Sequence, residues 1–228
     1  MTDGYISDDE QWEKFKAWWK ANGTFIIVGL AIGLAIIGGW RWWEHYQAQR
    51  DYNASALYAQ FEQALNKPAA DNDKNKNGNG EAEAIGKNLI ANYDDTPYAA
   101  QAALGLAGAE VTANKPDQAI QHLQWVVQNS DDGSLKLLAR LRLARVQIAN
   151  KQARAALQTL SVKDAGGFAS LYAEVRGDAY RALGETAKAH QAYQAALAAQ
   201  ADGTGSDPLL KLKLQHTAGA KPAPADKS

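Results

Sequence analysis

The sequence contains no cysteine among its 228 residues. This absence excludes disulfide bonds, thiolate metal sites and cysteine nucleophiles, and it leaves the chain indifferent to the redox state of its compartment. The chain also has no excess of charge of either sign: its net charge is -1, so nucleic acid is not an expected partner. Proline is scarce, with 6 residues, whereas alanine is abundant, and this composition favours helices packed closely through small side chains.

Motifs for catalysis or cofactor binding are also missing. The chain has no nucleophile elbow, P-loop or dinucleotide-binding glycine motif. Its histidines fit no metal-binding spacing. The segment Asp73–Gly78 matches the first half of an EF-hand calcium loop, but Ala84 stands where the closing glutamate belongs. We therefore expect neither an enzyme nor a cofactor or metal site.

One long hydrophobic run extends from Gly23 to Trp43, with no charged residue between Lys20 and Arg41. As a helix, rising ~1.5 Å per residue, it spans about 30 Å, the thickness of the hydrocarbon core of a bilayer. Indole rings favour the headgroup level of a membrane, and five of them stand at the two ends of the run: Trp18, Trp19, Trp40, Trp42 and Trp43. Residues 23–43 are therefore predicted to be a transmembrane helix in contact with lipid, with these tryptophans at the membrane interface.

Residues 1–22 are predicted to form an N-terminal tail with a short amphipathic helix. Ser7 and Glu10 have the spacing of a capping box, and Asn22-Gly23 predicts a stop before the membrane span. Aromatic residues recur on one side at helical spacing: Trp12, Phe15 and Trp19. The alternative is a charged N-terminal extension of the membrane helix itself.

Within the span, Gly29 and Gly33 form a G-x-x-x-G motif, a candidate helix–helix contact. Acidic residues at the N-terminus argue against a cleaved signal peptide. Three lysines precede the span, at positions 14, 16 and 20, and two arginines follow it, at 41 and 50. This small bias favours a cytoplasmic N-terminus and a C-terminal domain on the other side of the membrane.

Residues 44–215 are predicted to form a helical-repeat domain interrupted by a polar insert at 66–80. The insert has no apolar residue larger than alanine between positions 69 and 80 and should be a loop. Residues 207–216 suit a short helix that caps the open end of a repeat stack. The last residues, 216–228, are predicted to be a disordered tail.

The repeat signal is a tetratricopeptide-like spacing of large and small residues. A large–small pair is followed thirteen residues after the large one by a small residue and four later by a large one. This spacing occurs at Leu106-Ala107, Ala119 and Leu123, at Leu143-Ala144, Ala156 and Leu160, and in a third copy at Gly177, Tyr180, Gly184, Ala189, Tyr193 and Ala196. The predicted units are 55–97, 100–132, 137–169 and 170–203. The chain is thus predicted to be all-α, and a non-repetitive helical bundle is the alternative.

Helical repeat arrays bind partners through a concave face lined by the first helix of each pair. By that geometry four charged residues are candidates for a peptide or partner groove: Arg145, Glu174, Asp178 and Arg181. The alternative is a solvated helix face with charge pairs at i,i+4 spacing.

The order of these parts resembles the YfgM-like ancillary subunits of the bacterial SecYEG translocon. The resemblance covers roughly residues 5–200. It is most specific at Leu135–Leu157, and further elements of the pattern are echoed at Gly167–Ala169 and Val175–Asp178. The insert and the tail depart from the pattern.

This resemblance implies a single-pass protein of the bacterial inner membrane with a periplasmic repeat domain. It implies association with the SecYEG translocon and with a membrane-anchored, periplasmic peptidyl-prolyl-isomerase-like chaperone, in assistance to exported proteins, and it brings no catalytic residues. Two alternatives remain open. One is a scaffold for the cell envelope. The other is a regulator of opposite topology that sequesters a signalling protein through its repeat groove.

Overall fold

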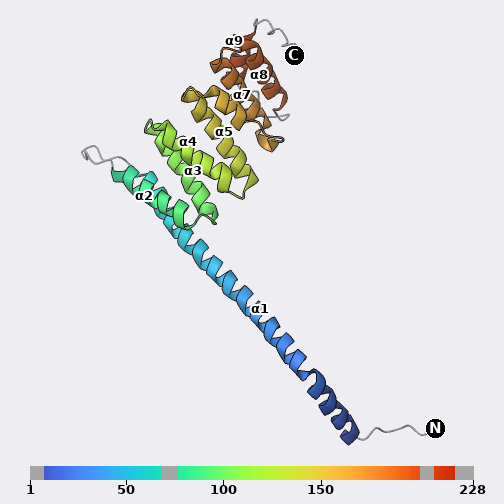
Figure 1. Ribbon diagram of the computed structural model, residues 1–228. Helices are drawn as coiled ribbons and strands as arrows, with labels where there is room; N and C mark the ends of the chain where they lie inside the picture. Colours follow the sequence, from blue (N-terminus) through green and yellow to red (C-terminus); the bar gives the residue numbers. More distant parts are fainter. Residues whose placement is uncertain (1–7, 68–76, 201–207, 219–228) are drawn as a thin grey trace, which may run out of the picture. The chain divides into compact units, whose positions relative to one another are not determined.

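The computed structural model describes residues 8–67, 77–200 and 208–218, and every regular element in these ranges is a helix (Figure 1). The helices are α1 (Asp8–Leu65), α2 (Asn77–Asn92), α3 (Pro97–Thr112), α4 (Pro116–Asn129), α5 (Gly133–Ala149), α6 (Ala153–Thr159), α7 (Ala169–Ala182), α8 (Thr186–Ala198) and α9 (Pro208–Thr217), with a 3-10 turn at Gly166–Phe168. The all-α prediction is confirmed. The chain divides into two compact units, Met1–Tyr52 and Asn53–Ser228, so the second unit begins later than the predicted residue 44.

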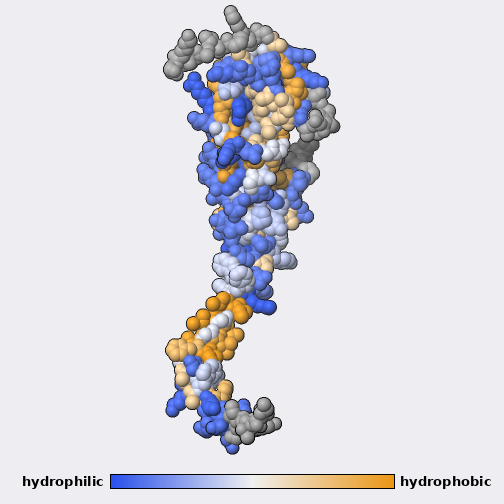
Figure 2. Space-filling view, turned by 90° about the vertical axis from the view of Figure 1, so that its right-hand side faces the viewer, coloured by the Kyte–Doolittle hydropathy of each residue, from blue (hydrophilic) through white to orange (hydrophobic). Residues whose placement is uncertain are grey.

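In the first unit, α1 carries the hydrophobic run with its side chains exposed. Phe25, Leu30 and Ile36 are 79%, 64% and 65% exposed, unlike the side chains of a buried core helix. Figure 2 shows the hydrophobic run as a largely apolar band on the surface of the molecule. Among the described residues, α1 is the one helix long and apolar enough to cross a membrane.

The predicted helix stop at Asn22-Gly23 is wrong, because α1 runs through it without interruption. The amide of Asn22 donates a hydrogen bond to the carbonyl oxygen of Trp18, 3.0 Å away, within the helix. Gly23 is buried under the indole of Trp19, where a β-carbon would lie 3.2 Å from the ring. The amphipathic segment is therefore an N-terminal extension of the same helix.

The second unit stacks helix pairs in chain order. The part of α1 beyond Tyr52 packs with α2, and the pairs α3–α4, α5–α6 and α7–α8 follow, with α9 against α8. Hydrophobic clusters lie between the two helices of one pair and the first helix of the next, for example between α3, α4 and α5. The same arrangement recurs between α5, α6 and α7. This three-helix packing confirms the predicted tetratricopeptide-like fold.

The two residues of each large–small pair pack into different hydrophobic clusters, which their spacing does not predict. Leu106 packs into the cluster with α1 and α2, whereas Ala107 packs against its own second helix, α4. In the next unit Leu143 faces α4 and Ala144 faces α6. Each first helix therefore joins two clusters.

The turns that join the two helices of the pairs α3–α4, α5–α6 and α7–α8 share one backbone geometry. Asn114, Lys151 and Gly184 have φ angles of 58°, 60° and 77°. In each turn the next residue's N–H donates to a carbonyl five residues back, with N···O distances of 2.8, 2.7 and 2.9 Å. This bond closes a Schellman motif, which ends a helix with one left-handed residue. Asn114, Lys151 and Gly184 therefore each stand at the end of the first helix of a pair.

Two predicted boundaries need correction. Residues 77–80, predicted to belong to the insert, form the start of α2. Residues 216 and 217, predicted to belong to the tail, are in α9, and Thr217 is buried with its hydroxyl 3.1 Å from Nδ1 of His190. The rest of the insert (68–76), with most of the calcium-loop resemblance, and residues 219–228 lie outside the described residues.

Candidate interaction groove

A cavity of about 520 Å³ opens on the first helices of three successive units. Leu65 of α1 and Arg142 of α5 border it. Its floor is α3, through Leu104, Gly105, Gly108, Ala109, Thr112 and Ala113. First helices line the concave face of tetratricopeptide-like arrays, so this cavity belongs to that face. We call it the α3 groove.

The groove is hollow because α3 presents small side chains to it. A β-carbon added at Gly108 would have no neighbouring atom within 4 Å, whereas one added at Gly105 would come 2.8 Å from the ring of Phe61. Gly105 is therefore required by the packing of the core, and Gly108 is not. The space over Gly108 is open to a ligand.

The border of the groove on α5 carries one cation, Arg142. Arg142 and Arg145 are both exposed and stand three residues apart on that helix. Among the described residues, neither has an ion pair or a side-chain hydrogen bond. The acidic residue of α3, Glu110, is 7% exposed, and its Oε2 lies 2.8 Å from Nδ1 of His122. It does not neutralise the arginines by direct contact.

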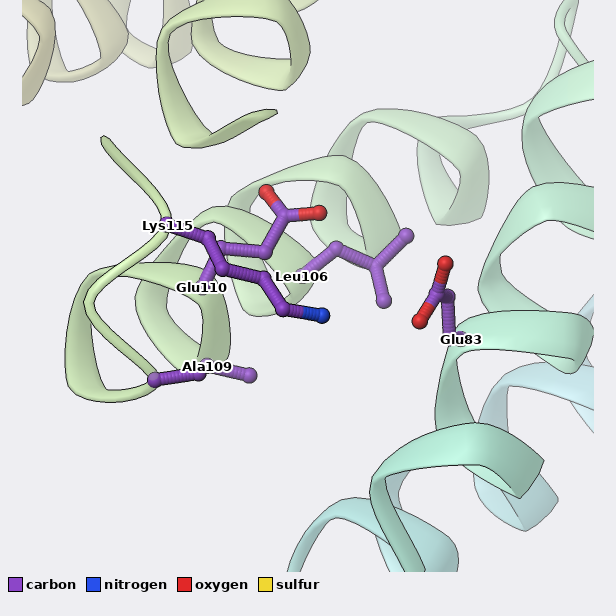
Figure 3. Close-up of a pocket in the computed structure, with 6 residues that line it drawn as sticks. Glu83, Leu106, Ala109, Glu110 and Lys115 are labelled. Carbon is purple, nitrogen blue, oxygen red and sulfur yellow. The ribbon is translucent and has the colours of Figure 1, made fainter. Parts of the chain in front are cut away.

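A smaller pocket adjoins the groove at the C-terminal end of α3, where it shares Ala109 and Ala113 (Figure 3). Figure 3 shows Lys115 reaching into this space, with Glu83 on a neighbouring helix. Lys87 donates a hydrogen bond of 2.6 Å to Glu83, and this bond and its charge lower the pKa of Glu83; Lys115 contributes less. At about 30 Å³ the pocket has room for little more than one water molecule.

Two of the predicted groove residues are engaged inside the chain. Nζ of Lys213, on α9, lies 2.7 Å from Oε1 of Glu174 and 2.8 Å from Oδ2 of Asp178. The hydroxyl of Tyr193 donates a hydrogen bond of 2.8 Å to Oδ1 of Asp178. Burial alone would lower the pKa of Lys213, but the hydrogen bonds and charges of the two carboxylates raise it. Glu174 and Asp178 therefore fasten α9 to α7.

The other predicted groove residues, Arg145 and Arg181, are exposed, and neither borders the cavity. Sequence reasoning missed Arg142, which does, although it stands one turn before Arg145 on the same helix. It also missed Lys213, because nothing in the local pattern of α9 points to carboxylates on α7. In the parts of the chain that the structure describes, no group of three or more metal-ligating residues comes together.

The membrane-facing candidates lie on the first unit. All five interface tryptophans are exposed: Trp18, Trp19, Trp40, Trp42 and Trp43. Trp42 stacks on Tyr46 with ring centroids 5.9 Å apart. In the described part of the chain, a β-carbon added at Gly29 or Gly33 would meet no side chain or other segment within 4 Å, so this face of α1 is open. Their roles at the interface and in helix–helix contact stay predictions.

Stacked helix pairs in one unit and, among the described residues, one exposed apolar helix in the other define the class: a tetratricopeptide-like repeat protein with a candidate membrane anchor. A family model for a tetratricopeptide repeat-like domain matches residues 16–219. A protein of Escherichia coli K12 named ancillary SecYEG translocon subunit is 29% identical over 212 residues, which are 93% of this chain and 97% of the relative. A protein of the same name from Aggregatibacter actinomycetemcomitans is 31% identical over 84% of this chain and 89% of its own.

The chain belongs to this tetratricopeptide repeat-like family, together with the YfgM-like ancillary SecYEG translocon subunits. A third relative with that name, from Neisseria gonorrhoeae, is 28% identical over 92% of this chain and 97% of the relative. No solved structure matches the chain. The resemblance noted in the sequence is confirmed.

Proposed function

We propose that the protein is a non-enzymatic interaction module that is anchored in the bacterial inner membrane beside the SecYEG translocon and assists exported proteins. The observation that carries the proposal is that relatives named ancillary SecYEG translocon subunits align with the anchor and the repeat unit together, over 93% of the chain in one case. A stack of helix pairs with an open groove supports a role in binding polypeptides.

In this proposal the N-terminus is cytoplasmic and the repeat unit periplasmic. Lysines 14, 16 and 20 precede the hydrophobic run of α1, and arginines 41 and 50 follow it, which favours this orientation. A periplasmic repeat unit would meet exported chains as they leave the channel. Its second partner would be a membrane-anchored peptidyl-prolyl-isomerase-like chaperone, and lipid would surround the anchor.

Arg145 and Arg181 remain candidates for the partner surface, and Arg142 joins them. Glu174 and Asp178 act differently: they hold α9 over the end of the stack through Lys213. A partner that reached them would have to replace this lysine.

Co-purification tests the proposal. The full-length protein would be tagged, extracted from membranes in mild detergent and captured, with an unrelated tagged single-pass membrane protein as control. We expect translocon subunits and a periplasmic chaperone to be enriched over the control. Enrichment of cytoplasmic proteins alone would contradict both the role and the orientation. The same capture with a Gly29→Leu, Gly33→Leu variant would test whether the small-residue face of α1 contributes to the binding of translocon subunits.

Topology can be tested separately, since the chain has no cysteine of its own. Single cysteines would be introduced at the exposed positions Lys16 and Ser134, one on each side of the hydrophobic run. In spheroplasts, a membrane-impermeant maleimide should label the Ser134→Cys protein and spare the Lys16→Cys protein until the membrane is broken. The reverse pattern would place the repeat unit in the cytoplasm.

A further inference from the structure

We propose that two copies of the protein pair in parallel through one face of α1, which extends from Trp12 to Trp43. The inference goes beyond the proposed function and takes from it only that α1 crosses a membrane. It is carried by the spacing of residues along α1, by aromatic rings that stand outside the lipid, and by the placement of the charged residues.

The face repeats every seven residues. Positions 12, 19, 26, 33 and 40 form one series, and positions 15, 22, 29, 36 and 43 form a second series three residues further on. These are the spacings of the a and d positions of a coiled coil, and Asn22 is the only polar residue at them. A seven-residue period on a helix of about 3.6 residues per turn favours a left-handed pair of helices. We call these positions the α1 seam.

The part of the seam before the hydrophobic run is the informative part, because nearly every position inside the run is apolar. Trp12, Phe15 and Trp19 stack in succession, with ring centroids 5.6 Å apart for the first two and 6.1 Å apart for the last two. Their exposed fractions are 56%, 48% and 44%. The three rings therefore present a continuous, exposed apolar surface along the seam.

Lipid does not reach the outer end of this ring surface. The hydrophobic run begins at Gly23, and α1 is continuous through it. At ~1.5 Å per residue, Phe15 lies about 12 Å and Trp12 about 16 Å before Gly23 along the helix axis. The headgroup layer extends the hydrocarbon core by only about 5–8 Å on each side. An apolar surface beyond that layer favours a protein partner over lipid.

The charged residues of this segment stand off the seam. Between positions 12 and 22 they are Glu13, Lys14, Lys16 and Lys20, and none of them is at an a or d position. Lys16, which flanks the seam, lies 3.4 Å from Oε1 of Glu13 and over the ring of Trp12 within its own helix. Two parallel copies would therefore bring their rings together without placing like charges between them.

A second copy is the partner that matches this face at every level. One membrane gives all copies of a single-pass protein the same direction and the same depth, so each seam position meets its own equivalent across a two-fold axis. Rings then meet rings outside the membrane. Within the span Gly29 and Gly33 meet glycines, which let two helices approach closely.

Asn22 sets the register of the pair. Its amide donates one hydrogen bond to the carbonyl oxygen of Trp18, 3.0 Å away. An asparagine side chain has a second N–H and a carbonyl oxygen, so two facing Asn22 residues can bond to each other. A single polar residue in an apolar seam specifies the alignment of two helices, and near lipid such a bond favours their association.

Oxidative cross-linking in membranes tests the seam, because the chain has no cysteine of its own. Single cysteines would be introduced into the full-length protein on the seam, as Ile26→Cys and Ile36→Cys. The controls are the equally apolar positions next to the seam, as Ile27→Cys and Leu34→Cys. With copper phenanthroline as oxidant, disulfide-linked dimers should form at positions 26 and 36 and stay at background at 27 and 34. Equal cross-linking at all four positions, or none on the seam, would overturn the inference.

The strength of the pairing would be measured by energy transfer between donor- and acceptor-labelled copies in phosphatidylcholine vesicles, at increasing ratios of lipid to protein. The labels would be attached through Ser134→Cys, at an exposed position. A Trp12→Ala, Phe15→Ala variant should weaken the association about 10-fold, because two layers of rings are lost. Trp42→Ala, which removes an exposed tryptophan off the seam, should leave it unchanged.

A second pair of variants tests the close approach inside the span. Gly33→Leu, on the seam, should weaken the association about 10-fold, because the leucine holds the two helices apart. Gly38→Leu is the matched control, because a β-carbon there is equally free of other atoms in the described part of the chain but lies on the opposite face. Energy transfer at the level of random mixing in the wild type, or equal losses in variant and control, would overturn the inference.

These outcomes separate the inference from the proposed function, since the vesicles contain no translocon. If the wild type does not pair yet co-purifies translocon subunits from membranes, the inference fails and the proposed function stands. If it pairs along the seam and recovers no translocon subunit, only the proposed function fails. A benzophenone amino acid at Phe15 should give adducts between two copies in cells, and adducts with other proteins alone would overturn the inference.

Discussion

Tyr193 of α8 lies so close to Gly177 of α7 that a β-carbon on the glycine would overlap Cε1 of the tyrosine ring. The ring is fully buried, and its hydroxyl still reaches Oδ1 of Asp178. Phe61 packs in a similar way in the cluster between α1, α2 and α3, where β-carbons added at Gly86 and Gly105 would each come within 3.0 Å of its ring. Large rings facing glycines therefore set the distance between neighbouring helices at both ends of the stack.

Replacing Gly177 with alanine should destabilise the repeat unit by about 1–3 kcal/mol, because either the ring or the helix must move. The matched control is Gly108→Ala, on another first helix, where the added methyl group meets no atom within 4 Å. That change should stabilise the unit by roughly 0.5–1 kcal/mol through helix propensity. Urea unfolding followed by circular dichroism would measure both. Similar effects at the two positions would contradict the packing described here.

Lys151 has a φ angle of 60° in its Schellman turn, a conformation that costs a residue with a β-carbon roughly 1–2 kcal/mol. Lys151→Gly should relieve this strain and raise the free energy of unfolding, by ~0.5–1 kcal/mol after the added freedom of the unfolded chain is subtracted. The control is Asn114→Gly at the equivalent turn, where asparagine already tolerates the left-handed region. Its effect should be close to zero. A loss of stability in Lys151→Gly would be evidence against the turn.

Alkaline pH should loosen the end of the stack that α9 covers. Burial raises the pKa of Tyr193, with a further contribution from its hydrogen bond to Asp178, and the two carboxylates raise the pKa of Lys213 against the effect of burial. Above pH ~10 the unfolded chain loses these protons first, so the folded state binds more protons and its stability falls as pH rises. The contribution of both groups is complete below their ordinary pKa values.

The measurement is the free energy of unfolding between pH 8 and 11.5 for the wild type, Tyr193→Phe and Lys213→Met. Each variant should show a shallower decline above pH 10 than the wild type. Lys211→Met, which removes an exposed lysine of α9, should decline as the wild type does. A wild-type stability that stays level up to pH 11.5 would refute the proposed linkage.

Glu110 and His122 should be energetically coupled. They join α3 to α4 across a separation of twelve residues. Gln147 and Thr159 provide a comparison: they join α5 to α6 with the same separation, through a hydrogen bond with an O···O distance of 2.9 Å. A double-mutant cycle to alanine at Glu110 and His122 should give a coupling of about 0.5–3 kcal/mol. The same cycle at Gln147 and Thr159 should give less, since it involves an amide in place of a carboxylate. Additive effects at Glu110 and His122 would show that the contact contributes nothing.

Much of the repeat unit could be predicted because its signals are local. The small residue thirteen positions after the large one placed Leu106-Ala107 against Ala119 and Leu143-Ala144 against Ala156. In the structure Ala107 shares a cluster with Ala119, and Ala144 shares one with Ala156. Gly184, one of the residues of the third repeat copy, adopts a φ angle of 77°, a left-handed conformation that glycine takes without steric cost. The candidate membrane span is a local signal as well, because its length and apolar composition both lie within one helix, α1.

What could not be predicted depends on contacts between distant segments. Lys213 lies 39 residues from Glu174, and no local pattern signals that the two meet. The α3 groove arises from what α1, α3 and α5 leave unfilled, a property of three helices together. Asn22-Gly23 shows the opposite case, in which a local signal gave a wrong prediction. These residues are typical of a helix end, but α1 continues through them, and the amide of Asn22 donates a hydrogen bond to the carbonyl oxygen of Trp18 within the helix.

The order of the hydrophobic clusters along the chain affects how the repeat unit can fold during synthesis. The first is built from α1, α2 and α3, and the next ones from α3 to α5 and from α5 to α7. Each is complete as soon as one more helix has followed along the chain, so a polypeptide synthesised from its N-terminus can bury its apolar surface step by step. At every stage the exposed remainder is a single helix pair. The architecture thus limits the surface available for aggregation while the molecule is still being made.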